Sequence, residues 1–123
     1  MEFCITAKQG FFEMRLSSDI DPGTCPEVLD TLFAHHEWKP GSLLLVDESD
    51  LRADDLTIAG LKEIAEICIS RGSDFGATRM SMYVSRDLEY GLNRMWHVFT
   101  GDNWEVEGAV FRSREEAMEW LGV

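Results

Sequence analysis

Five carboxylates lie close together in the middle of the chain and could bind a cation. They are Asp47, Glu48, Asp50, Asp54 and Asp55. They follow a continuous apolar run, which is typical of a buried strand, and ligands of open α/β sheets bind beyond the carboxyl ends of the strands. Hard cations such as Mg²⁺ and Ca²⁺ prefer such oxygen ligands. A divalent-cation-dependent enzyme using the acidic loop 47–55 is therefore one candidate function, with Asp47, Glu48 and Asp50 as metal ligands.

A purely structural role explains part of this acidic segment as well. The spacing lacks the glycine and the terminal glutamate of an EF-hand loop. Asp54 is suited to capping the helix that follows, and Asp55 would lie near the positive end of that helix.

A second group of side chains forms a small basic and aromatic cluster. Its members are Arg86, Tyr90, Arg94, Trp96 and His97. Apart from Trp96, they fall on one side of an expected helix, opposite an apolar stripe formed by Leu88, Leu92, Met95 and Phe99. Tyr90 and Arg94 are one turn apart and could share a ligand. The cluster could bind an anion or dock an acidic surface; alternatively, its charges only solvate an exposed helix face.

Charge and composition limit the range of functions. The chain of 123 residues has 11 Lys and Arg against 23 Asp and Glu, a net charge of −12. Such an acidic surface repels nucleic acid and anionic membranes, so neither is expected as a partner. Three widely spaced cysteines and the absence of a secretion signal favour a cytoplasmic protein with reduced thiols. No zinc spacing, phosphate loop or catalytic triad is present, and no cofactor is expected.

The elements that position these groups follow from the apolar patterns and the turn residues. Strands are expected at Phe3–Ala7, Phe11–Leu16, Leu43–Val46, Arg79–Val84 and Glu105–Phe111. Helices are expected from a Thr24 capping box to about Glu37, from an Asp54 cap to about Arg71, over Arg86–Phe99, and from a Ser113 capping box to Leu121. The order ββαβαβαβα predicts a single α/β domain over residues 1–123, with a mixed sheet of about five strands and four helices.

The last third of the chain resembles a known family. A helix with the pattern "dLxyGLxRMw", at residues 87–96, precedes a strand and a closing helix with "vFRsxeEAxxWL", at residues 110–121. Together with Lys39-Pro40-Gly41 and Asp47, these motifs resemble small bacterial proteins with the STAS-like (SpoIIAA-like) fold, a family without an established activity. The resemblance is strongest over Lys39–Leu121.

The resemblance implies a regulatory role and suggests two further features. In sporulation antagonists of this fold, a phosphorylated Ser begins the second helix; at that place the present chain keeps one hydroxyl, Thr57. Some relatives of this fold hold apolar ligands in a pocket between the sheet and the helices. In the present chain such a pocket could be lined by Met80, Met82, Met95 and Trp96.

The leading hypothesis is a non-catalytic regulatory or interaction module. It would bind a protein partner or form a homodimer through the basic and aromatic cluster. The alternative is a binder of a small apolar or anionic ligand, and the third candidate is the divalent-cation enzyme.

Overall fold

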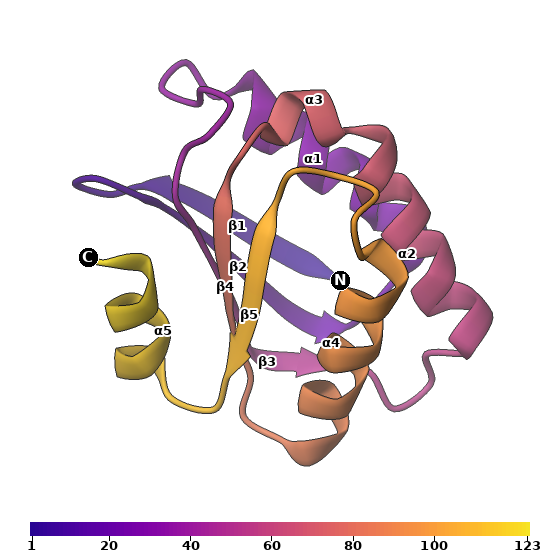
Figure 1. Ribbon diagram of the computed structural model, residues 1–123. Helices are drawn as coiled ribbons and strands as arrows, with labels where there is room; N and C mark the ends of the chain where they lie inside the picture. The colour runs from indigo at the N-terminus through magenta and orange to yellow at the C-terminus, as the bar shows by residue number, and fades with distance from the viewer.

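A five-stranded mixed sheet forms the centre of the molecule (Figure 1), whose computed structural model describes all residues 1–123. The elements are β1 (Glu2–Ala7), β2 (Phe12–Asp19), the 3-10 turn η1 (Pro22–Thr24), α1 (Cys25–Ala34), β3 (Leu44–Arg52), α2 (Ile58–Ser70), α3 (Gly72–Phe75), β4 (Arg79–Tyr83), α4 (Asp87–Thr100), β5 (Glu107–Phe111) and α5 (Arg114–Leu121). The strand order is β1-β2-β3-β4-β5. Only β1 and β2 pair antiparallel. The predicted α/β class and order are confirmed, with the single-turn α3 as an addition.

The helices cover the two faces of the sheet unequally. Helices α1, α2 and α4 lie on one side and α5 alone lies on the other (Figure 1). The larger hydrophobic core lies between the sheet and helices α1, α2 and α4. A smaller core around Leu45, Ala117 and Leu121 lies under α5. The central strand β3 buries Leu44 and Leu45, which point to opposite faces. The continuous apolar run therefore marks a central strand, as predicted.

Two helix starts differ from the prediction. Thr24 has helical backbone angles and makes no capping bond, because the 3-10 turn already begins at Pro22 with Asp21 as its cap. The first helix also ends at Ala34 rather than near Glu37. The cap of α2 is Thr57, which accepts a hydrogen bond from the Gly60 N–H at 3.0 Å, so the assignment of Asp54 as the cap was wrong.

The acidic segment is mostly strand rather than loop. β3 continues through Arg52 because it pairs with the long strand β2, after a register shift between Arg15 and Ser17. Consequently, Asp47 and Glu48 lie on a strand, and successive side chains point to opposite faces of the sheet.

The buried face of α4 is rotated from the predicted stripe. Glu89, Trp96 and Thr100 are buried, whereas Leu88 is 44% exposed and Met95 is 37% exposed. Glu89 can lie inward although it is charged, because it forms an ion pair with Arg86 at 2.6 Å. None of the helices is both long and apolar enough to pass through a membrane.

Candidate functional site

A cavity of about 110 Å³ lies between the sheet and helices α1, α2 and α4. Of the 23 residues that line it, 20 are hydrophobic. The sheet contributes Met14, Val46, Met80 and Met82, and the helices contribute Val28, Ile64 and Trp96, among others. Ligand sites in proteins are commonly concave, mostly apolar and equipped with a few convergent polar groups, and this cavity has that composition.

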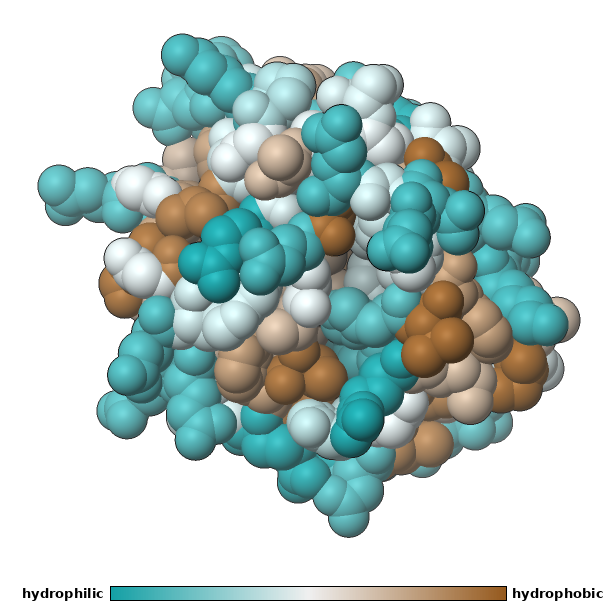
Figure 2. All heavy atoms as spheres, viewed as in Figure 1, coloured by the Kyte–Doolittle hydropathy of each residue, from teal (hydrophilic) through white to brown (hydrophobic).

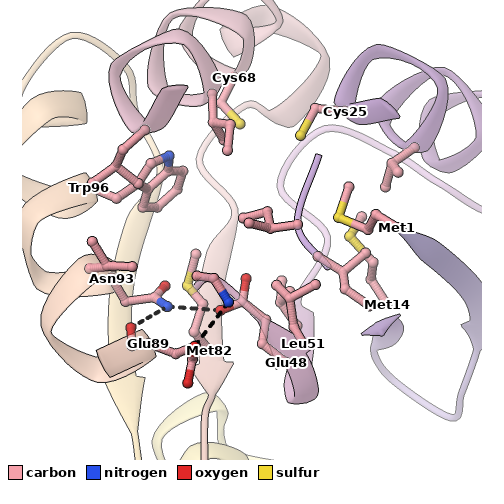
Figure 3. Close-up of a pocket in the computed structure, with 18 of the residues that line it drawn as sticks. Met1, Met14, Cys25, Glu48, Leu51, Cys68, Met82, Glu89, Asn93 and Trp96 are labelled. Atoms are coloured by element: carbon pink, nitrogen blue, oxygen red, sulfur yellow. Dashed lines mark hydrogen bonds between the residues drawn. The ribbon is translucent and has the colours of Figure 1, made fainter. Parts of the chain in front are cut away.

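The polar residues gather at one end of the cavity (Figure 3). Glu48 comes from β3, and Glu89 and Asn93 come from adjacent turns of α4. The Asn93 side-chain amide donates to Glu48 Oε1 at 2.8 Å and to the Glu89 carbonyl at 3.0 Å. The second carboxylate oxygen of Glu48 accepts no hydrogen bond from the protein, so the polar end of the cavity has one free acceptor.

Glu89 is buried, at 3% exposure, but its charge is fully compensated. Its carboxylate accepts two hydrogen bonds from Arg86, at 2.7 and 2.6 Å, and one from the Ala53 N–H at 3.1 Å. Burial opposes ionisation of Glu89, but the bonds from Arg86 and Ala53 outweigh it and lower its pKa. Glu89 therefore stays ionised at the cavity wall as one half of an ion pair with Arg86.

Glu48 has no such cation. Burial raises its pKa to about 7, a rise that the hydrogen bond from Asn93 reduces and the neighbouring Glu89 and Asp47 increase. A nearby positive charge or several hydrogen bonds would lower the pKa of a buried carboxyl. Glu48 accepts one side-chain hydrogen bond, from Asn93, and Arg86 is occupied by Glu89 and Asp54. Glu48 therefore changes charge close to neutral pH.

Trp96 and two cysteines lie farther from the polar end. The Trp96 indole N–H is buried and has no hydrogen-bond partner, unlike that of Trp38, which donates to the Asp74 carbonyl at 2.9 Å. Cys25 and Cys68 line the cavity from α1 and α2 (Figure 3). Burial is the main cause that raises the pKa of Cys25 to about 11 and that of Cys68 to about 12. Neither thiol is an activated nucleophile, since the reactive form is the thiolate.

The acidic residues proposed as metal ligands do not converge. Asp47 accepts from the Ser49 N–H and hydroxyl, at 3.0 and 2.6 Å, and contacts Arg114. Glu48 faces the cavity, and Asp50 pairs with Arg15 at 3.0 Å. No group of three or more His, Cys, Asp or Glu side chains is placed to hold a metal ion.

The basic and aromatic cluster also separates into different environments. Arg86 is held in ion pairs with Glu89 and Asp54, and Trp96 lines the cavity. His97 packs over β5, where its Nε2 lies so near Gly108 that a Cβ there would be 2.5 Å away. Its Nδ1 lies 2.7 Å from the Asn93 carbonyl, and burial lowers its pKa. Only Tyr90 and Arg94 remain free of such roles.

Other predicted residues lie in simple surroundings. The Thr57 hydroxyl is exposed and caps α2, and its phosphorylation stays a prediction. Met80, Met82 and Trp96 line the cavity as expected of an apolar pocket, whereas Met95 points outward. Glu89 and Asn93 were missed as lining residues. The sequence does contain a pattern that indicates them: Glu89, Asn93, Trp96 and Thr100 are three or four residues apart and therefore share one face of the helix.

The sequence matches no protein-family model and no curated protein. The structure is similar to that of an uncharacterised protein from Shewanella loihica PV-4, described as a DUF3478 family member with a SpoIIAA-like fold. The TM-score is 0.62 and the identity 17%, with 98% of this chain and 92% of the other covered. At this identity the likeness concerns the fold. Together with the strand order and the placement of the helices, it shows that this chain has the SpoIIAA-like fold.

Proposed function

We propose that the chain is a non-catalytic binding domain that holds a small, mainly apolar ligand between its sheet and helices. The observation that carries this proposal is the cavity itself, with its apolar walls and a single polar end. Well-packed cores contain few voids larger than a water molecule. An engineered apolar cavity of about 150 Å³ binds benzene, which has six non-hydrogen atoms. A volume of about 110 Å³ therefore holds about four or five such atoms, and a ligand with one more atom fits when a flexible methionine of the wall moves.

The side chains of the cavity support binding more than catalysis. Both thiols have raised pKa values, and no histidine lines the cavity. The methionines are flexible, so the walls can adapt to ligands of somewhat different shape. We further infer that the domain works in a bacterial cytoplasm, where its three free cysteines would stay reduced.

Nuclear magnetic resonance of the tryptophan indole N–H groups tests the proposal. Pentan-1-ol and benzene should shift the Trp96 resonance in a saturable way, with millimolar dissociation constants, because a ligand this small offers about 4 kcal/mol. The Trp38 resonance is an internal control, since its N–H is bonded to Asp74 outside the cavity. Val28→Phe, which fills the cavity from α1, should remove the response in a folded protein. Absence of any Trp96 shift in the wild type would overturn the proposal.

A second candidate is a protein contact through the outer face of α4. Leu88, Met95 and Val98 are exposed there, Val98 at 77%, beside Tyr90 and Arg94. Figure 2 shows hydrophobic residues over α4 among hydrophilic ones. The partner would be another protein or a second copy of the chain. Arg94→Glu should then weaken association, measured by sedimentation, without changing the melting temperature; unchanged association would remove this candidate.

A further inference from the structure

The charges around the cavity exclude one class of ligand. Its lining contains Glu48, Glu89 and Asn93 as its charged or amide side chains, and no Lys, Arg or His. A carboxylate or phosphate entering the polar end would lie near Glu48 and Glu89, with no cationic side chain in the lining to pair with. Burying an unpaired charge costs several kcal/mol, so the anionic ligand considered from the sequence does not suit this site.

The second oxygen of Glu48 is available to a hydrogen-bond donor from outside the chain. Glu48 Oε1 accepts from Asn93 at 2.8 Å, and no protein donor reaches the other oxygen. Arg86 is the nearest guanidinium in this network, but its nitrogens bind Glu89 and Asp54 at 2.6 to 3.4 Å. A hydrogen-bond donor to the second oxygen of Glu48 must therefore come from outside the chain, as water or a ligand. A donor that also carries a positive charge would compensate the carboxylate as well.

We propose that the ligand of this cavity is a small apolar amine, whose ammonium group binds the free carboxylate oxygen of Glu48 and whose hydrocarbon part fills the apolar end. This inference rests on the proposed ligand-binding function and specifies its ligand class.

Binding should depend on pH through Glu48. The charged or titratable groups around it are Glu89 on α4, Asp47 on β3, and the thiols of Cys25 and Cys68 on α1 and α2. An alkylamine keeps its proton up to a pKa of about 10, whereas Glu48 ionises near pH 7. Raising the pH from 6 to 8 should therefore increase the affinity for the amine about tenfold and leave the affinity for a neutral alcohol almost unchanged.

Three molecules of equal length test the inference by titration calorimetry at pH 8: pentan-1-amine, pentan-1-ol and pentanoate. The amine should bind at least tenfold more tightly than the alcohol, which corresponds to about 1.4 kcal/mol, and pentanoate should bind least. Glu48→Gln, which keeps the size and the acceptor for Asn93, should abolish this preference. Glu66→Gln, at an exposed position of α2, removes the same charge and should retain it.

The outcomes separate the two proposals. If alcohol and amine bind equally, or if Glu48→Gln keeps the preference, the amine inference is wrong but ligand binding stands. If none of the three molecules binds, the proposed function fails together with the inference. The pH profile of the wild-type protein gives an independent result should Glu48→Gln not fold, and a flat profile for the amine would overturn the inference.

Discussion

Replacing Glu48 by Gln should stabilise the protein, and mainly at neutral or higher pH. The folded protein holds the pKa of Glu48 near 7, against an ordinary value of 4.5. Between these values the folded state binds one more proton than the unfolded state, so stability falls as the pH rises. A tenfold change in proton affinity is worth about 1.4 kcal/mol. Ionised Glu48 therefore costs the folded protein about 3 kcal/mol above pH 7, and less near pH 5.

Urea denaturation at pH 5 and pH 8 measures this effect. Gln keeps an oxygen that accepts from Asn93 but cannot ionise, so the variant should gain about 2 to 3 kcal/mol over the wild type at pH 8. At pH 5 the two proteins should differ by less than about 1 kcal/mol. Glu66→Gln controls for the loss of one charge at an exposed site of α2. An equal difference at both pH values, or a less stable Gln variant at pH 8, would show that the folded protein does not raise the pKa of Glu48.

Three other predictions concern the surroundings of the cavity and its supports. Arg86→Met should destabilise the protein by about 3 kcal/mol in urea denaturation at pH 7, because it leaves buried Glu89 without its cation; a loss below about 1 kcal/mol would contradict this. Gly76→Ala should cost at least about 2 kcal/mol, since Gly76 has a φ of +64° and a new Cβ would lie 2.8 Å from the Pro40 Cβ; Gly91→Ala, at an open position, is the matched control. A thiol reagent at pH 8 should modify exposed Cys4 first and Cys25 and Cys68 far more slowly, as followed by mass spectrometry; equal rates would show that the cavity is open to the reagent.

The sheet could be predicted well because each of its strands has a local signal. The run Leu43–Val46 lacks alternation, and the structure places it at the centre with both faces covered. The Ser113 cap, which accepts from the Glu116 N–H at 3.3 Å, was also readable from spacing. The extension of β3 to Arg52 was not, because it depends on pairing with a strand far away in the sequence.

The cavity could not be predicted from hydrophobic patterns alone. On α4 the apolar stripe that includes Leu88 and Met95 competes with the face that carries Glu89 and Trp96, and the second face is buried. The deciding contact is the ion pair between Arg86 and Glu89, supported by the Ala53 N–H, which lies 36 residues earlier in the chain. The sequence shows Glu48 as one of five neighbouring carboxylates. Its separation from Asp47 becomes predictable only when both are placed on β3, where successive side chains point to opposite faces.

A crystal structure of the protein soaked with pentan-1-amine would show whether an amine binds in the cavity. We expect the hydrocarbon chain beside Met82 and Trp96, with the nitrogen within about 3 Å of the Glu48 carboxylate. Side chains that close the cavity in the crystal, or an amine bound elsewhere with its nitrogen away from Glu48, would contradict this expectation.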